Sequence, residues 1–284
     1  MFEMFNLSFM VQAFIACVMM GLILSYLGIH VVGRGIVFVD LALGQISSLG
    51  VAFADYSGYG KVWVPIVFTL TGAFLLSLIH IKDRRLKLEA IIGIIYAIAS
   101  ACTVLLISKT PHGEADISEV LFGHILAVTA ADMRNMAIVF AGLALLHAVF
   151  FKQIFCLTEM MEGEQTPSFT VRERLWNFFF YLSIGLAIVF AVRAGGVLPV
   201  FSYLVIPPVI AVLVARSKLL VVLITFFNAI VASLFGLYVS YTFDFPTGAS
   251  IVAVFGVMFA GAGILRLLRV RLMKPALEND LSKA

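Results

Sequence analysis

The segment SFMVQAFIACVMMGLILSYLGIHV, Ser8–Val31, carries no Asp, Glu, Lys or Arg and is followed by the turn Gly33-Arg34-Gly35. A helix needs about 20 apolar residues to cross the hydrocarbon core of a bilayer. No basic residue precedes the run and no small-residue cleavage site follows it, so we expect a retained helix and not a signal peptide. The segment therefore predicts a first membrane span that ends at a basic turn.

Eight further apolar runs follow, each of about the length of a span, and short polar loops separate most of them. They are Ile36–Ala54, Val62–Ile81, Leu88–Ile107, Asn135–Phe151, Leu175–Val192, Val197–Ala215, Leu219–Thr242 and Ser250–Leu268. Gly195-Gly196 and Pro207-Pro208 are helix breakers that would reduce the count to eight. The expected fold class is all-α, a polytopic transmembrane helical bundle of eight to nine helices.

The basic residues sort to alternate loops. If every run crosses, 15 of the 19 Lys and Arg residues fall on one side of the membrane. Lys and Arg in short loops resist translocation, so the richer side is the cytosolic one. We therefore expect the N-terminus outside and the C-terminus inside, with a transmembrane domain over residues 1–274 and a cytoplasmic tail over 275–284. The four basic residues on the outer side are Lys61, Lys109, Arg134 and Arg193.

The composition is that of a membrane protein in contact with lipid. The chain is 62% hydrophobic and 12% charged, with a mean hydropathy of +1.10, whereas soluble proteins carry about 25% charged residues. This excludes a sizeable soluble domain, and the net charge of +3 follows the topology and indicates no nucleic-acid partner. The sequence has no GxxxxGK[ST], HExxH or GxSxG motif, so we expect no enzyme. If the chain moves a solute against its gradient, the energy would have to come from an ATPase in another subunit or from an ion gradient.

Asp40 is the one acidic residue well inside an expected span. It lies about 7 Å from the inner end of its helix at about 1.5 Å per residue, where a carboxylate costs on the order of 3 kcal/mol. Two interpretations stay open: Asp40 faces a path for cations, or it pairs with Arg34 at the inner leaflet. Gln45 lies farther along the same helix, near mid-depth.

The outer segment between Ser108 and Arg134 is too polar to span and is rich in acidic and histidine side chains. An acidic vestibule raises the local concentration of cations, and mixed sets of His and carboxylate ligands suit zinc or manganese. The alternative is a solvated polar loop, because the spacing matches no defined metal motif. The side chains are His112, Glu114, Asp116, Glu119, His124 and Asp132.

The longest inner polar segment is Lys152–Arg174. Within it, Thr158–Glu164 predicts a short helix that Pro167 would end. Such a helix would face a cytosolic partner, and a plain solvated loop is the alternative. Its acidic side chains are Glu159, Glu162 and Glu164.

Four stretches follow one another along most of the chain: Val31–Ala52, then Glu89–Gly93 with Leu121–Asp132, then Gly195–Pro208, then Asp244–Ser250. In this order they resemble the permease family of zinc- and manganese-type ABC transporters. The ordered set is more specific than any one of its members.

The resemblance implies a multi-pass permease subunit of an ABC importer in a bacterial plasma (inner) membrane. The substrate would be a divalent metal cation, either zinc, manganese or iron, with no tightly bound cofactor. The implied partners are a cytosolic ATPase that alone binds ATP, a second permease copy in a homodimer or pair, and an extracytoplasmic metal-binding protein. Thr158, Glu159, Glu162 and Glu164 would then belong to the element that couples to the ATPase.

Three residues stand at or near the family's metal-path positions. Asp40 matches the acidic position of the second helix, Gln45 stands near its usual histidine, and His124 replaces the usual Asp after Leu-Phe-Gly. The resemblance places them along the translocation path or at its entrance. Gln is a poor zinc ligand, so these departures favour a transient, water-mediated path over a tight site and leave the metal open.

Two other functions stay open on the sequence alone. An ion-coupled secondary transporter would carry charges on several spans and an internal repeat, whereas this chain offers one intramembrane carboxylate and no visible repeat. An intramembrane enzyme would need paired catalytic residues at matched depth, and the sequence shows none.

Overall fold

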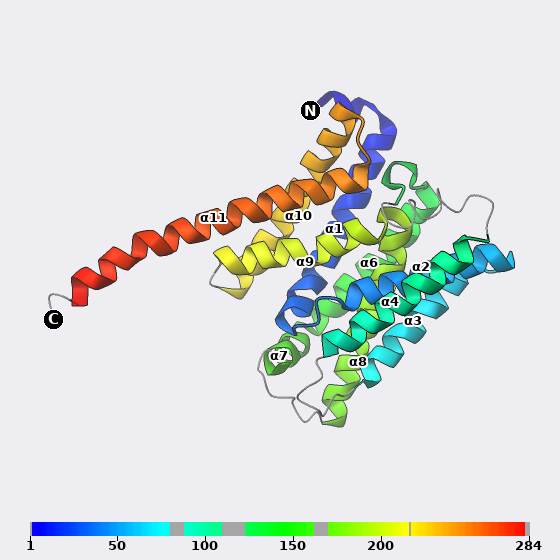
Figure 1. Cartoon of the computed structure of the whole chain (residues 1–284), viewed down its shortest axis with the longest axis horizontal. Helices are drawn as coiled ribbons and strands as arrows, with labels where there is room; N and C mark the ends of the chain where they lie inside the picture. Colours follow the sequence, from blue (N-terminus) through cyan, green and yellow to red (C-terminus); the bar gives the residue numbers. More distant parts are fainter. Residues whose placement is uncertain (1, 80–87, 110–122, 162–169, 216, 282–284) are drawn as a thin grey trace.

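The computed structural model describes residues 2–79, 88–109, 123–161, 170–215 and 217–281, and within these ranges it is entirely helical (Figure 1). The all-α prediction is therefore confirmed. The elements are η1 (Phe2–Asn6), α1 (Ser8–Gly33), α2 (Val39–Ser57), α3 (Trp63–Leu78), α4 (Leu88–Ile107), η2 (Ile125–Ala127), α6 (Ala130–Val149), α7 (Phe151–Met161), α8 (Val171–Gly195), α9 (Val197–Val214), α10 (Lys218–Phe243) and α11 (Thr247–Leu281).

Seven of the described helices are long and apolar enough to cross a membrane, namely α1, α4, α6, α8, α9, α10 and the Thr247–Leu268 part of α11. The other two helices expected to span are less clear-cut: α2 has 19 residues but contains Asp40 and Gln45, and α3 has only 16 residues. A polytopic helical bundle is confirmed. The total of eight to nine spans and the orientation in the membrane stay predictions.

Two helices begin earlier than the hydrophobic runs, because side chains cap them. Before α6, the hydroxyl of Thr129 accepts a hydrogen bond from the Asp132 N–H at 3.2 Å. Before α8, Thr170 and Glu173 form a reciprocal capping box, in which each side chain bonds the backbone N–H of the other residue. Such caps satisfy N–H groups that have no partner inside the helix.

At the other end of the chain, helix α11 continues to Leu281 and so includes most of the expected tail.

Pro207 and Pro208 lie inside α9 without ending it. Pro208 has no N–H, so the carbonyl of Leu204 lacks the hydrogen bond that it would make four residues on. That carbonyl lies against Gly28 of α1, where a β-carbon would be 1.7 Å from the Leu204 oxygen. Helices α1 and α9 therefore touch through backbone atoms. Of the two expected breaks, the one at Gly195-Gly196 is present, between α8 and α9.

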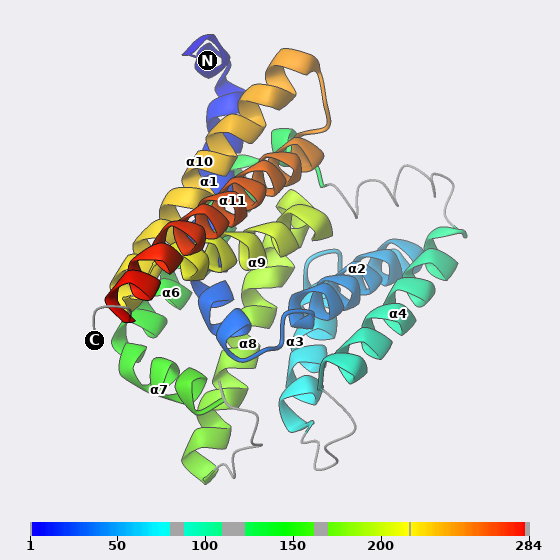
Figure 2. The ribbon, with the colours of Figure 1, turned by 60° about the vertical axis from the view of Figure 1, so that its left-hand side comes forward.

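The centre of the bundle consists of α1, α8 and α9. Helices α2, α3 and α4 pack on one side of it, and α10 and α11 pack on the other (Figure 2). More than half of each central span is buried, against less than a quarter of α4, α6 and α11. The outer helices expose large apolar side chains such as Ile98, Leu145 and Val257. Apolar surface of this extent is unfavourable in water but matches a lipid environment.

Candidate functional site

Asp40 lies in the first turn of α2 and is only 2% exposed. Its Oδ1 accepts a hydrogen bond from the Leu41 N–H at 2.8 Å, while Oδ2 is buried without a hydrogen-bond partner among the described residues. A buried carboxylate oxygen without a partner is costly unless it receives a donor or a cation. The predicted burial of this acid inside the bundle is thus present, and one of its oxygens is available.

Arg34, the alternative partner considered for Asp40, is engaged elsewhere. Its Nε donates to the hydroxyl of Thr158 at 3.1 Å and its Nη1 donates to the side-chain oxygen of Asn177 at 3.2 Å. The guanidinium carbon also lies 3.6 Å from the centroid of the Phe180 ring. No ion pair joins Arg34 to Asp40 within the described ranges.

Gln45 is buried on α2, next to the point where this helix meets the α8–α9 turn. A β-carbon on the neighbouring Gly44 would lie 3.4 Å from Val197 and 3.7 Å from Val192. These two valines flank Gly195-Gly196 on either side. The middle of α2 therefore packs directly against the break between the two central helices.

The segment before His124 meets the same turn. Gly123 has a φ of +67°, and a β-carbon on it would be 2.3 Å from the carbonyl carbon of Gly195. Only glycine fits this contact, since it combines the left-handed backbone with the absence of a side chain. His124, the residue before η2, is exposed. Gln45 and His124 are far apart in the sequence, and the structure brings the segments that carry them to one turn.

The remaining outer side chains divide into two groups. The hydroxyl of Thr129 donates to the Asp132 carboxylate at 2.5 Å, so Asp132 serves the start of α6. The other four candidate side chains lie outside the described residues: His112, Glu114, Asp116 and Glu119. Within the described ranges, no three His, Cys, Asp or Glu residues are arranged so that they could hold a metal ion together.

A short helix is present in this segment, but it begins earlier than Thr158 and runs over Phe151–Met161 as α7. Its contact with an ATPase stays a prediction. Its buried residues Ile154, Leu157 and Thr158 follow the i, i+3, i+4 spacing of one helix face. Thr158 is only 7% exposed, so it faces the bundle and not a cytosolic partner. Glu159 is exposed and forms an ion pair with Lys218 at the start of α10. Glu162 and Glu164 lie outside the described residues.

Thr158 joins α7 to the end of α1. Its Oγ1 lies 2.9 Å from Nδ1 of His30, accepts from Arg34 Nε, and donates to the Ile154 carbonyl of its own helix at 3.0 Å. The sequence analysis considered Arg34 as a partner of Asp40 and did not connect His30, Arg34 or Asn177 with Thr158. The sequence did carry a signal for these residues, because each is a polar side chain placed within or directly after an apolar run.

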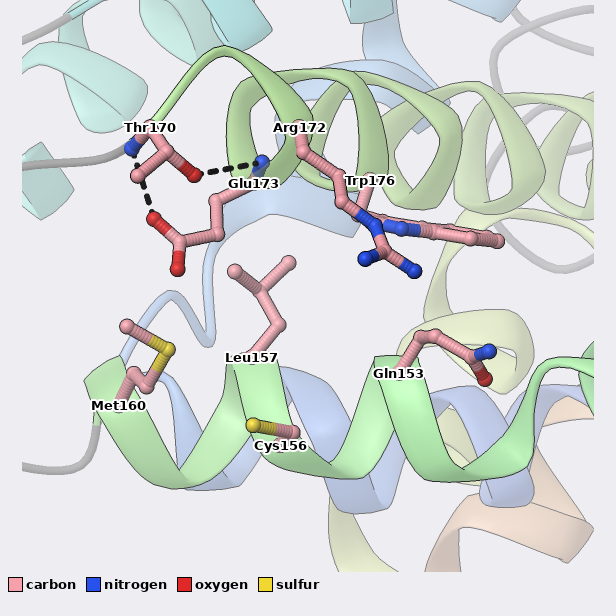
Figure 3. Close-up of a pocket in the computed structure, with 8 residues that line it drawn as sticks. All are labelled: Gln153, Cys156, Leu157, Met160, Thr170, Arg172, Glu173 and Trp176. Atoms are coloured by element: carbon pink, nitrogen blue, oxygen red, sulfur yellow. Dashed lines mark hydrogen bonds between the residues drawn. The ribbon is translucent and has the colours of Figure 1, made fainter.

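A pocket of about 210 Å³ separates α7 from the start of α8 (Figure 3). Figure 3 shows Met160, Leu157, Cys156 and Gln153 projecting from α7, opposite Glu173, Arg172 and Trp176 on α8. The Thr170–Glu173 capping box closes one end of it. The pocket is lined by both apolar and charged groups.

Comparisons with known proteins match nearly the whole chain. A family model described as the ABC 3 transport family matches residues 6–266. The manganese transport system membrane protein MntC of Listeria monocytogenes is 27% identical over 254 residues, which are 89% of this chain and 89% of that protein. The manganese import system permease protein ScaB of Streptococcus gordonii is 25% identical over 88% of this chain and 89% of its own length.

A solved structure extends the likeness to three dimensions. PsaBC from Streptococcus pneumoniae, in complex with Fab, is matched with a TM-score of 0.76 and 25% identity, over 92% of this chain and 94% of that chain. The range matched by the family model contains every helix from α1 to α10 and most of the apolar part of α11.

Proposed function

Because the chain belongs to the ABC-3 transport family, we propose that it is the permease subunit of an importer for a divalent metal cation, with manganese as its main substrate. The family match confirms the resemblance seen in the sequence and favours ATP-driven transport over the ion-coupled alternative. The chain is a multi-pass membrane protein of a transport family, and hydrolysis of ATP would fall to a separate cytosolic subunit.

The observation that carries the proposal is the buried carboxylate of Asp40, whose Oδ2 has no hydrogen-bond partner among the described residues. Manganese prefers carboxylate, carbonyl and water oxygens, whereas imidazole is a better ligand for zinc. Gln45 supplies an amide oxygen near the family's usual histidine position, which shifts the donors on α2 toward oxygen. The relatives MntC and ScaB, both described as manganese transport proteins, support the same choice.

The proposed path runs along α2 and past the α8–α9 turn. The Gly44–Gln45 level of α2 and the Gly123–His124 segment both reach this turn. A delivered cation would thus meet exposed His124 first and buried Asp40 deeper in the bundle. The proposal includes an extracytoplasmic binding protein that delivers the cation, an ATPase that docks at α7, and a second permease copy.

The test is metal accumulation in cells that lack their own manganese importer and express this chain with its ATPase and binding protein. We expect uptake of manganese above zinc and iron, and loss of uptake in Asp40→Asn at equal amounts in the membrane. Asparagine keeps the shape of the side chain and removes the charge that attracts the cation. Normal uptake by Asp40→Asn would reject this role of Asp40, and preferential zinc uptake would reject manganese as the substrate.

A further inference from the structure

The polar cluster around Arg34 lies outside the proposed metal path and joins α7 to the rest of the bundle. Arg34 is only 6% exposed and has no ion pair with a carboxylate in the described part of the chain. Its guanidinium donates hydrogen bonds to Thr158 on α7 and Asn177 on α8, and it lies over the Phe180 ring of α8. A buried guanidinium held by neutral groups depends strongly on each of them, because the loss of one leaves charge without compensation.

The hydroxyl of Thr158 is fully used in this cluster. It accepts a hydrogen bond from Arg34, it donates one to the Ile154 carbonyl, and its remaining lone pair can accept a hydrogen bond from the Nδ1–H of His30. These bonds coexist when His30 carries its proton on Nδ1. One hydroxyl thus joins α7 to two side chains at the end of α1, and the contact is specific in direction as well as distance.

Arg34 is also the first residue of a short, ordered connection to α2. The Gly35 N–H donates to Val32, the Ile36 N–H to Val31 and the Val39 N–H to Ile36. Ile36 is buried, and Asp40 follows in the first turn of α2. A displacement of α7 that carries Arg34 along would reach Asp40 through a connection held by backbone hydrogen bonds.

We propose that Arg34 is a positioning residue that transmits movement of α7 to the helix that carries Asp40. This inference rests on the proposed function, since it assigns to α7 the contact with the ATPase. Arg34 touches neither the cation nor ATP; it acts through Thr158 on one side and the connection to α2 on the other. Removal of the Arg34–Thr158 bond would leave the two subunits assembled but separate ATP hydrolysis from metal movement.

The experiment measures manganese imported per ATP hydrolysed by the complete permease–ATPase complex in vesicles supplied with the metal-loaded binding protein. Thr158→Val keeps the shape of the side chain and removes all three hydrogen bonds, whereas Thr158→Ser keeps the hydroxyl. A hydrogen bond to a charged group changes an equilibrium by about tenfold or more. We expect Thr158→Val to lower the manganese-to-ATP ratio by about tenfold, with normal co-purification of the ATPase, and Thr158→Ser to restore it.

Thr103 provides a matched control. It is buried to 3% exposure on α4, and the hydrogen bond recorded for its hydroxyl goes to the Ala99 carbonyl of its own helix, 2.8 Å away. Thr103→Val should therefore keep the ratio of the unaltered complex. An equal fall in Thr103→Val and Thr158→Val would overturn the inference, because general packing would then explain both.

A second variant covers the case in which Thr158→Val does not assemble. Arg34→Lys keeps the charge but cannot bridge Thr158 and Asn177, because an ammonium lacks the planar fork of a guanidinium. A low ratio in Arg34→Lys supports the inference, and an unchanged ratio overturns it. If the unaltered complex imports manganese and the variants keep its ratio, only the inference fails. If the unaltered complex imports none, the proposed function fails as well.

Discussion

Replacement of Gly28 by alanine tests the contact on which the centre of the bundle depends. The added β-carbon would lie 1.7 Å from the oxygen and 2.7 Å from the carbon of the Leu204 carbonyl. A carbon–oxygen contact settles at about 3.3 Å or more, so α1 and α9 would have to separate by about 1.6 Å at this crossing. A gap of 0.5–1 Å already removes about a quarter to a half of the attraction between packed atoms.

The expected cost follows from two opposing effects. Overpacking of a tight contact costs about 1–3 kcal/mol and occasionally more, while glycine to alanine inside a helix gains up to about 1 kcal/mol. Because the obstacle is backbone and not a flexible side chain, we expect a net loss near the upper end, about 2 kcal/mol. The assay is thermal unfolding of the purified permease in one detergent, with the amount of folded protein in the membrane as a second measure.

Two matched controls isolate the steric effect. Gly93 on α4 and Gly142 on α6 are also helical, and a β-carbon on either would have no described atom beyond its own helix within 4 Å. Gly93→Ala and Gly142→Ala should therefore unfold at the same or a slightly higher temperature than the unaltered chain. A Gly28→Ala variant as stable as these two would refute the backbone contact between α1 and α9.

Two further predictions concern the metal and the topology. Gln45→His should raise zinc uptake relative to manganese, because imidazole is the better zinc ligand; an unchanged ratio in a metal-competition assay would remove Gln45 from the path. A reporter fused after Lys274 should be active only in its cytosolic form, as the distribution of Lys and Arg predicts. Activity of an exported reporter at that position would reverse the orientation.

The helices were largely predictable because hydropathy is a property of local sequence. The run Leu88–Ile107 coincides with α4, and Val197–Ala215 differs from α9 by one residue. The early starts of α6 and α8 also had local signals, since Thr129 and Thr170 are each followed three residues later by an acidic residue. This is the spacing of an N-terminal cap, which a count of apolar residues alone does not weigh.

The contacts of α7 were less predictable because they join residues far apart in the chain. The apolar residues Ile154 and Leu157 already indicated a helix face before Thr158. Nothing local to Thr158 indicates its partners: Arg34 is 124 residues away along the chain, and His30 is 128 residues away. A polar side chain such as Asn177 within an apolar run signals that a partner exists, but hydropathy does not identify that partner.

The positive charge of Arg34 affects the proposed metal path even though Arg34 forms no ion pair with Asp40. A basic residue beside the start of α2 would be the obvious neutralising partner for Asp40, and such an ion pair would compete with an arriving cation. Instead, Arg34 is bound by Thr158 and Asn177, and Oδ2 of Asp40 remains without a partner in the described structure. The hydrogen bonds of Thr158 and Asn177 therefore have two consequences. They fix the end of α1, and they hold the guanidinium of Arg34 away from the Asp40 carboxylate, which is proposed to receive the metal.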